Sequence, residues 1–334
     1  MSKKLGWGVV GTGWIAGDQM APAIGKSLDA EFVAVVSRDQ ARGQEFADTH
    51  GAARALTSYE DLLADGDVDV VYIGTPNALH ADEVVAAAGA GKHILCDKPL
   101  ATSVADAERA LEAANAAGVK LGINFQTRHH TVMPEIRKRV ADGEIGAPLI
   151  VQCELSPGRK ALGGWRTDSE LAGLGTTNNL AIHAYDLLRY LLDDEVVEVT
   201  ALYDVGRREE QETVALALLR FAGGTLAYVN ANQVVPDNQP DIAIYGVEGR
   251  ILGRSVMQSL PVGEVSVLSG GEEITTETSS LDAFEGCVNA FSRAVIDDTE
   301  PNASGVDGLR SVEIVDAVGR SAREGRLIEL SAVT

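Results

Sequence analysis

The sequence predicts an α/β protein in which a doubly wound parallel sheet is followed by an α+β domain with an open, mostly antiparallel sheet. Up to about residue 124, short apolar strands alternate with helical patterns. After Pro148 longer strands follow one another with few helices between them. A glycine-rich turn also comes directly after the first strand. A chain of 334 residues is long enough for two separate cores, so we expect two domains.

The strands of the first domain are short and largely apolar. The segment VDVVYIG, for example, lacks polar alternation, which is typical of a parallel strand that helices cover on both faces. Helices are expected between the strands, as in a doubly wound domain. The predicted strands are Leu5 to Val10, Glu31 to Ser37, Val68 to Gly74, His93 to Cys96 and Lys120 to Asn124.

The second half of the chain has a different pattern. Its strands include LIVQCEL, VVEVTALY, TVALALLRF and GTLAYVNANQ, which indicate an antiparallel sheet. Helices are expected at Asn178 to Leu192, near Phe284 to Ile296 and at Gly308 to Arg323. We therefore predict domains at residues 1–125 and 126–334, and the last helices are candidates for packing back on the first domain.

Composition excludes several classes of partner. The chain has 28 basic and 49 acidic side chains, and its formal net charge of −21 repels nucleic acids and anionic lipids. The three cysteines, Cys96, Cys153 and Cys287, lie far apart, so neither a disulfide framework nor a metal site is expected. No apolar run approaches the ~20 residues of a membrane span, and no signal peptide is evident. We expect a cytoplasmic protein.

The turn after the first strand has the spacing G-x-G-x-x-A. Gly11 permits a tight turn, Gly13 lets the backbone approach a pyrophosphate, and Ala16 allows close helix packing. The helix that follows directs its N–H groups and positive dipole end toward the phosphates. This context predicts a dinucleotide site in a Rossmann domain, formed by Gly11, Thr12, Gly13, Trp14, Ile15 and Ala16.

The end of the second strand indicates which dinucleotide binds. NAD sites usually place an acidic side chain there, on the ribose hydroxyls, whereas this chain has Ser37 and Arg38. A guanidinium pairs with a 2′-phosphate and stacks on adenine, so NADP is favoured. Asp39 follows directly, and NAD is therefore retained as an alternative.

Two further turns lie at the carboxyl edge of the predicted parallel sheet, where such sheets bind ligands. Their sequences are Gly74-Thr75-Pro76-Asn77, followed by His80, and Cys96-Asp97-Lys98-Pro99. Together with the glycine turn, the T-P-N-x-x-H and D-K-P segments resemble those of the glucose-fructose oxidoreductase, inositol dehydrogenase and MocA family (Gfo/Idh/MocA). The resemblance covers essentially the whole chain.

The second half carries further matching segments. They are Trp165-Arg166, Gly173-Leu174-Gly175, and the run from Asn179 through His183 to Asp186. The resemblance implies a Rossmann domain, an α+β domain with an open antiparallel sheet, and NAD(P)-dependent oxidation or reduction of sugars, polyols or related alcohols and ketones. Relatives usually carry Asp where this chain has Asn179, and an amide cannot accept a proton for transfer.

Hydride transfer to or from an alcohol requires a group that takes or returns the hydroxyl proton. An imidazole with a pKa near ~6.5 suits this role, and a Lys ammonium polarises the same oxygen. Lys98 and His183 are the predicted catalytic residues, with Asn179 and Phe284 added for substrate binding. Asn179 lies four residues before His183, which indicates a shared helix face. Matched positions imply that Thr75, Pro76, Asn77, His80, Asp97, Lys98, Asn124, Trp165 and Arg166 contact the cofactor.

Three functions remain open from the sequence. The leading hypothesis is a dehydrogenase or reductase of a carbohydrate-like substrate. A second keeps the chemistry but uses a non-sugar substrate such as a dihydrodiol, and a third is a dinucleotide-binding sensor without turnover. Because open antiparallel sheets are usually covered, a homodimer or homotetramer built through the second-domain sheet is expected.

Overall fold

The computed structural model describes residues 4–156, 163–204, 211–235, 241–257, 262–277 and 282–331. The chain forms two compact units. The first contains residues 1–125 and 284–309, and the second contains residues 126–283 and 310–334. The boundary at residue 125 is where the parallel-strand pattern of the sequence ends, while residues 284–309 return to the first unit from far along the chain.

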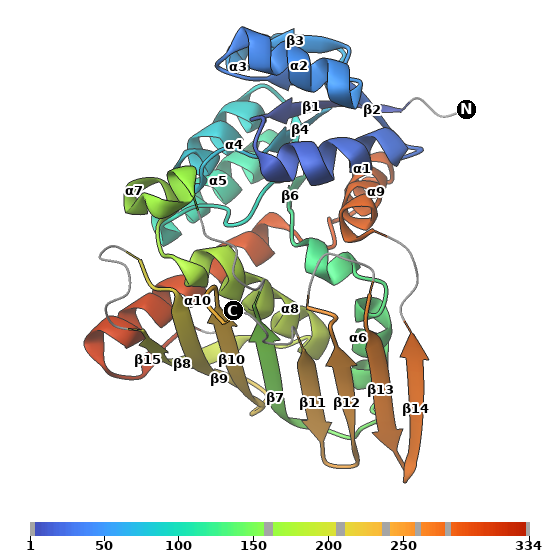
Figure 1. Ribbon diagram of the computed structural model, residues 1–334, viewed down its shortest axis with the longest axis vertical. Coiled ribbons are helices and arrows are strands. Elements are labelled where there is room, and N and C mark those ends of the chain that lie inside the picture. The colour runs from blue at the N-terminus through green and yellow to red at the C-terminus, as the bar shows by residue number, and fades with distance from the viewer. Residues whose placement is uncertain are drawn as a thin grey trace. The chain divides into compact units, whose positions relative to one another are not determined.

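The sheet of the first unit has six parallel strands in the order β3-β2-β1-β4-β5-β6 (Figure 1). This is the Rossmann order, and its topological switch point lies between β1 and β4. The strands are β1 (Leu5–Val10), β2 (Ala30–Val36), β3 (Arg54–Leu56), β4 (Val70–Ile73), β5 (His93–Cys96) and β6 (Leu121–Ile123). The parallel sheet predicted from the apolar strands is therefore confirmed.

The helices of the first unit begin at side chains that satisfy free backbone N–H groups. Ser58, Asp39 and Ser103 each accept a hydrogen bond from the first turn of the helix that follows. The helical segments are η1 (Ala16–Met20), α1 (Ala21–Lys26), α2 (Gln40–His50), α3 (Tyr59–Ala64), η2 (Asn77–Leu79), α4 (His80–Gly89) and α5 (Val104–Ala117). The helix α9 (Ala283–Ile296) joins them from the second half of the chain.

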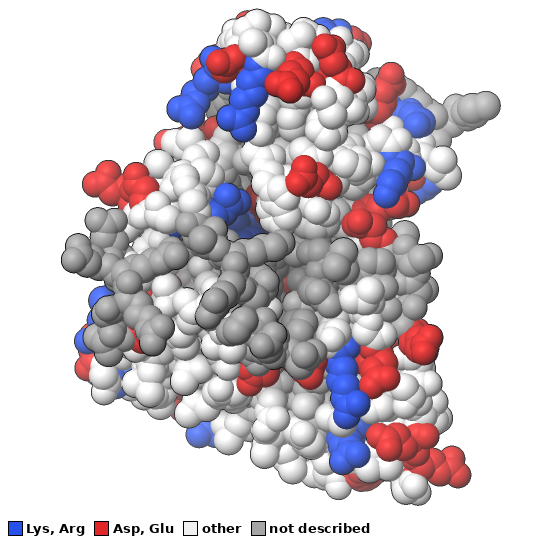
Figure 2. Space-filling model, in the orientation of Figure 1, with Lys and Arg blue, Asp and Glu red and all other residues white. Residues whose placement is uncertain are grey.

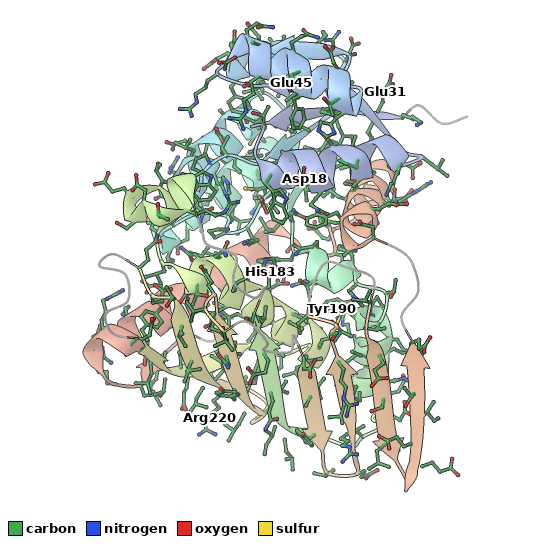
Figure 3. All side chains as sticks on the ribbon, viewed as in Figure 1. Asp18, Glu31, Glu45, His183, Tyr190 and Arg220 are labelled. Atoms are coloured by element: carbon green, nitrogen blue, oxygen red, sulfur yellow. The ribbon has the colours of Figure 1, made fainter. Side chains whose placement is uncertain are left out.

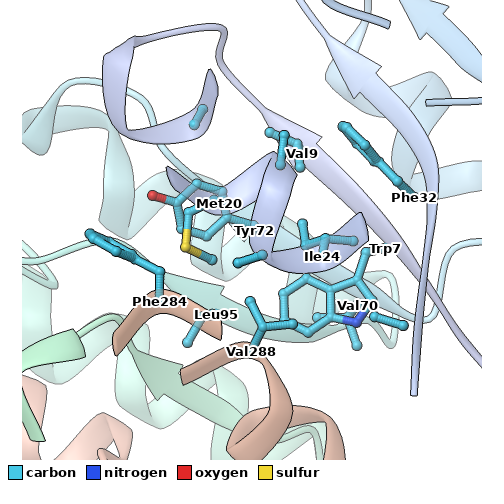
Figure 4. Close-up of a cluster of buried hydrophobic side chains, with 14 of the residues drawn as sticks. Trp7, Val9, Met20, Ile24, Phe32, Val70, Tyr72, Leu95, Phe284 and Val288 are labelled. Atoms are coloured by element: carbon cyan, nitrogen blue, oxygen red, sulfur yellow. The ribbon is translucent and has the colours of Figure 1, made fainter. Parts of the chain in front are cut away.

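Helix α9 completes the core on one side of this sheet. Phe284 and Val288 pack in one cluster with Met20 of η1 and Ile24 of α1 (Figure 4). Phe291 meets Trp7 edge to face at 5.9 Å. Phe284 is only 3% exposed. A tyrosine here would place its hydroxyl beside an apolar core, so phenylalanine suits the position.

The second unit contains a nine-stranded sheet in the order β14-β13-β12-β11-β7-β10-β9-β8-β15, and only the β7–β10 pair is parallel. The mostly antiparallel sheet predicted for this half is confirmed. Its strands are β7 (Pro148–Leu155), β8 (Val196–Tyr203), β9 (Val214–Phe221), β10 (Leu226–Asn232), β11 (Ile242–Gly246), β12 (Gly249–Arg254), β13 (Glu264–Ser269), β14 (Glu272–Glu277) and β15 (Ile328–Glu329).

One face of this sheet is buried and the other is not. In β9 every second residue is buried, and the residues between them are half-buried at the start of the strand and exposed at Leu218 and Arg220. Helix α8 packs on the covered face against β7. The helical segments of the unit are η3 (Gln126–His129), α6 (Met133–Ala141), η4 (Gly164–Thr167), α7 (Ser169–Ala172), η5 (Thr177–Ala181), α8 (Ile182–Leu192) and most of α10 (Gly305–Glu324).

Candidate active site

The glycine turn closes the switch point of the parallel sheet. Gly11 has φ +96°, and a Cβ on it would lie 2.9 Å from the main-chain oxygen of Gly74, which follows β4. Only glycine fits there without strain. Around Gly13, in contrast, a Cβ would meet nothing within 4 Å, so the main chain at this residue is open to a ligand. The helix begins at Trp14, and its first-turn N–H groups have no intrahelical acceptor.

The residues that the sequence assigned to the adenosine end lie around the tip of β2. Ser37 is 7% exposed and follows the strand directly, while Arg38 is exposed. The Asp39 carboxylate accepts a hydrogen bond from Arg42 N–H at 3.0 Å and caps α2. This acidic side chain therefore has a structural partner of its own at the start of the helix.

Sequence reasoning missed Arg42. Its Nη2 donates a hydrogen bond to the main-chain oxygen of Thr12 at 2.7 Å, which brings an exposed guanidinium against the glycine turn. The residue lies in the first turn of α2, four positions after Arg38, which precedes the helix. No sequence signal marked Arg42, because its contact is with a main-chain oxygen 30 residues away.

A second group of predicted residues meets at the carboxyl ends of β4, β5 and β6. The Asp97 carboxylate accepts hydrogen bonds from Tyr72 hydroxyl at 3.2 Å, from Asn124 Nδ2 at 3.4 Å and from the main-chain N–H of Lys98 at 2.9 Å. Asn124 N–H in turn donates to the oxygen of Cys96 at 2.8 Å. The turn that carries Lys98 is thereby fixed to the neighbouring strands.

His80 connects this turn with the T-P-N segment. Its Nδ1 lies 2.7 Å from the oxygen of Pro99, and its Nε2 lies 2.9 Å from the oxygen of Thr75. The ring is 1% exposed, and burial lowers the pKa of His80. The imidazole therefore ties together the two loops that carry Asn77 and Lys98, rather than presenting a free surface to a ligand.

No sequence motif marks the carboxyl of Glu83, which contacts the T-P-N segment. The Thr75 hydroxyl donates a short hydrogen bond to Glu83 Oε2, and the Tyr59 hydroxyl donates to the main-chain oxygen of Glu83 at 2.7 Å. Burial raises the pKa of Glu83 to about 7, with a smaller rise from Asp82 and a lowering from the Thr75 hydroxyl. A carboxyl that titrates near neutrality thus lies next to a predicted cofactor loop.

In the second unit, the predicted residues lie at and before the start of α8. His183 stands in the first turn of α8 and is 9% exposed (Figure 3). Asn179 lies in η5, a π-helical turn that runs directly into α8. A π-helical turn is wider than an α-helical one, so the shared face expected from the spacing of four stays a prediction. Asn178 is turned inward, and its Nδ2 donates to the oxygen of Ala172 at 3.0 Å.

A buried ion pair supports this helix from the other side. Arg128 in η3 donates from Nε and Nη2 to the two carboxylate oxygens of Asp186 at 2.7 and 2.6 Å, and both side chains are almost completely buried. Asp186 is the last residue of the segment singled out in the sequence, whereas its partner had gone unnoticed. Before α7, the Arg166 guanidinium lies over the Trp165 ring at 4.4 Å.

The structure thus gathers the predicted residues in two sets. The glycine turn, Ser37, Arg38 and the loops after β4, β5 and β6 belong to the first unit, and Trp165, Arg166, Asn179 and His183 belong to the second. That Lys98 and His183 meet at one substrate stays a prediction. Within the described part of the chain, no group of three His, Cys, Asp or Glu side chains is arranged to hold a metal ion. No helix in that part is long and apolar enough to cross a membrane.

A Rossmann sheet with an open glycine turn at its switch point, followed by an α+β domain, defines the class of nicotinamide-dinucleotide-binding oxidoreductases. The family model described as "Oxidoreductase family, NAD-binding Rossmann fold" matches residues 5–125. The family model described as "GFO/IDH/MocA C-terminal domain" matches residues 133–252. The chain belongs to the Gfo/Idh/MocA family of oxidoreductases.

Named relatives match along their whole lengths. A 1,5-anhydro-D-fructose reductase of Ensifer adhaerens is 33% identical over 97% of this chain and 98% of its own. A D-xylose 1-dehydrogenase (NADP(+)) of Haloferax volcanii is 31% identical over 97% and 99%. Among solved structures, this chain is similar to an aldose-aldose oxidoreductase of Caulobacter crescentus complexed with glycerol, with a TM-score of 0.92 and 28% sequence identity. The match covers 98% of this chain and 100% of the other.

Proposed function

We propose that this protein is an NADP-dependent dehydrogenase or reductase of a sugar, polyol or related alcohol or carbonyl. The observation that carries the cofactor choice is the pair of arginines at the tip of β2. Arg38 is exposed there, and Arg42 is held against the oxygen of Thr12 at 2.7 Å. A 2′-phosphate accepts charge-assisted hydrogen bonds from two such guanidinium groups, and Ser37 leaves room for it.

The residues present fit a dinucleotide. Gly13 offers an open main chain, the helix from Trp14 offers its N-terminal N–H groups, and the loops after β4 and β5 lie at the same sheet edge. When bound, the nicotinamide would accept a hydride from the carbinol carbon or return one to a carbonyl carbon.

This chain's own residues would handle the proton. On oxidation the substrate hydroxyl loses its proton to a neutral base, and on reduction the carbonyl oxygen gains one from an acid. We assign this exchange to Lys98 and His183, with Asn179 donating or accepting a hydrogen bond that orients the substrate or the imidazole. The fixed Asp97 carboxylate and the buried His80 hold the turn of Lys98 in place.

The names of the relatives support the substrate class. One acts on an anhydro-sugar and one on xylose, and both span nearly the whole chain. The test is a panel of D-xylose, D-glucose and myo-inositol with NADP⁺, and 1,5-anhydro-D-fructose with NADPH, assayed by absorbance of the reduced cofactor. Dihydrodiols included in the same panel test the non-sugar alternative.

A matched pair of variants tests the proton step. Lys98→Met keeps the length of the side chain without its charge, and we expect it to lower kcat by about 100-fold or more while NADPH still binds. Lys138→Met, on the exposed surface of α6, is the control. Unchanged turnover in Lys98→Met would remove this residue from the chemistry.

Asn179 gives the non-catalytic alternative its one specific support, because an amide stands at a position where the resemblance implies Asp. A dinucleotide sensor would bind NADPH and turn over no substrate on the panel. Appreciable turnover of any sugar or polyol would exclude this alternative.

We further propose that the protein is a homodimer or homotetramer in which the open face of the nine-stranded sheet is covered by a second copy. Neighbouring strands place large apolar side chains on this face. Leu226 and Ile150 are paired in register, and they are 44% and 48% exposed. Leu218 and Leu202, 58% and 68% exposed, continue the patch on β9 and β8. A two-fold contact buries the same patch on both copies.

A further inference from the structure

Glu212, which lies outside every predicted motif, accepts hydrogen bonds from the backbone amides at the start of the helical segment that carries His183. Glu212 lies just before β9 and is 9% exposed. Its Oε2 accepts a hydrogen bond from Gly175 N–H at 2.9 Å, and its Oε1 accepts one from Thr177 N–H at 2.8 Å. Thr176 N–H, between them, donates to the main-chain oxygen of Glu212 at 3.0 Å. Three successive amides thus converge on one residue.

These amides lie at the N-terminal end of a helical segment, where backbone N–H groups need acceptors from outside the helix. η5 runs from Thr177 into α8, and the first N–H groups of a helix have no acceptor within it. A carboxylate that accepts two of them forms charge-assisted hydrogen bonds and complements the positive end of the helix dipole. In the described part of the chain, the hydrogen bonds to the Glu212 carboxylate come from the backbone amides of Gly175 and Thr177.

The approach of the two segments depends on glycine. A Cβ on Gly175 would lie 2.3 Å from the oxygen of Glu212, so no larger residue fits without displacing the strand. Gln211 adds a hydrogen bond from its Nε2 to the oxygen of Gly173 at 3.1 Å. The Gly173-Leu174-Gly175 segment, which in the sequence was only a matching motif, is therefore the surface against which Glu212 packs.

Glu212 is itself fixed to the sheet. Asp204, after β8, accepts hydrogen bonds from the N–H groups of Thr213 and Val214 at 2.8 and 2.9 Å and from the Thr213 hydroxyl at 2.6 Å. Thr177 Oγ1 also donates to the Tyr203 hydroxyl at 3.0 Å. The start of the helix is held to the ends of two sheet strands, with Glu212 at the centre of the contact.

We propose that Glu212 is a positioning residue for the reaction, because it fixes the backbone from which Asn179 and His183 project. Asn179 follows Thr177 by two residues, and its own N–H donates to the oxygen of Gly175 at 3.0 Å. A shift of the capped amides therefore moves both side chains relative to a substrate. The inference rests on the proposed catalytic function of His183 and Asn179.

The test compares Glu212→Gln with Glu264→Gln, a surface variant on β13. A glutamine keeps one acceptor and turns an NH₂ group toward the other amide, so one hydrogen bond is lost. Hydrogen exchange is measured by mass spectrometry on peptides covering residues 173–185, together with kcat and KM for the best sugar of the panel and the Kd for NADPH.

We expect exchange over residues 175–179 to rise by about tenfold or more in Glu212→Gln, and kcat to fall by about tenfold or more. The Kd for NADPH and the KM for the cofactor should stay within about twofold, because misplacement affects the reacting groups and not the dinucleotide turn. A purely structural role would lower the fraction of folded enzyme and leave kcat per folded enzyme unchanged.

Two results would overturn the inference. One is faster exchange with wild-type kcat and KM, and the other is unchanged exchange over residues 175–183. If wild-type protein turns over nothing on the panel, the proposed function fails by itself, and the exchange measurement alone still decides whether Glu212 holds the segment.

Discussion

Arg42 and Thr12 are joined across the mouth of the dinucleotide turn. The Arg42 guanidinium donates to the Thr12 oxygen at 2.7 Å, while its main-chain N–H is capped by Asp39. The same contact orders the guanidinium beside the glycine turn. A pre-ordered guanidinium loses less side-chain freedom when it binds a phosphate than a free one.

Arg42→Ala is therefore expected to weaken NADPH binding by about tenfold to 100-fold, the effect of losing a hydrogen bond to a charged group. Binding of NADH, which lacks the 2′-phosphate, should change by less than about threefold. Titration of cofactor fluorescence measures both constants.

Arg254→Ala, an exposed variant on β12, is the matched control for this titration. Equal losses for NADPH and NADH in Arg42→Ala would mean that the guanidinium only shapes the turn. Tighter binding of NADH than NADPH by the wild-type protein would reject the NADP assignment and leave the Rossmann site intact.

Glu83 makes the stability of the first unit depend on pH. Burial raises its pKa from 4.5 to about 7, so between these values the folded protein holds a proton that the unfolded chain releases. The free energy of unfolding therefore falls as pH rises from about 5 to 8, by on the order of 2 kcal/mol after allowance for partial exposure. Glu83→Gln, which cannot titrate, should lose this part of the pH dependence.

Urea unfolding at pH 5 and pH 8 measures the effect. Glu45→Gln, on the exposed surface of α2, is the control and should follow the wild type (Figure 3). The same slope in wild type and Glu83→Gln would show that Glu83 does not titrate in this range. Because Thr75 donates to this carboxyl, the Kd for NADPH is measured alongside.

Two ion pairs in the second unit allow a direct comparison of burial. Arg128 and Arg137 both lie over the ring of Tyr190, at 5.0 and 4.6 Å, but Arg128 pairs with buried Asp186 and Arg137 with exposed Asp193. Asp186→Asn removes the buried carboxylate charge that pairs with Arg128, and we expect a loss of about 3 to 5 kcal/mol in unfolding free energy.

Asp193→Asn should cost less than about 1 kcal/mol, because exposed pairs contribute little. Asn also tolerates the left-handed conformation of this residue, φ 51°. Thermal or urea unfolding of the two variants decides the matter. Similar losses for both would show that water screens the Arg128–Asp186 pair as fully as the exposed one.

Local sequence patterns predicted the elements well where packing alone determines them. β1, β5 and β8 have the predicted bounds, and β2, β4 and β6 differ from their predicted bounds by one or two residues at each end. β3 was missed, because three half-buried residues carry no period. The packing of α9 in the core of the first unit could not be predicted from its sequence, because an apolar helix face does not indicate which surface it packs against.

The candidate site divides in the same way. The glycines, Ser37, Arg38 and Lys98 were predicted as site residues because their positions relative to the strands have a chemical meaning, and they stay predictions. Arg42, Glu83 and Glu212 make hydrogen bonds with main-chain atoms or hydroxyls that lie 8 to 37 residues away in the chain. No spacing rule encodes such contacts, so only the folded structure identifies these residues.

Figure 2 shows side chains of both charges interspersed on one face of the molecule. The open face of the nine-stranded sheet carries an apolar patch formed by Ile150, Leu202, Leu218 and Leu226. Patches of this kind on a sheet mark a contact surface. Around Leu218, register pairs it with Tyr228 on one side and Thr200 on the other. A charge at Leu218 would stand in the middle of the proposed interface between copies.

Leu218→Asp is therefore expected to shift the protein toward monomers, because burying two unpaired carboxylates, one from each copy, costs several kcal/mol in an isologous contact. Sedimentation velocity at micromolar concentration measures the change.

Leu28→Asp, at an 84% exposed position of the first unit, is the control and should leave the assembly intact. A wild-type protein that sediments as a monomer would contradict the assembly outright, and an oligomeric Leu218→Asp would place the interface elsewhere. Loss of assembly with folding preserved, checked by circular dichroism, would assign the interface to this sheet face, since Leu218 is already solvent-exposed within one chain.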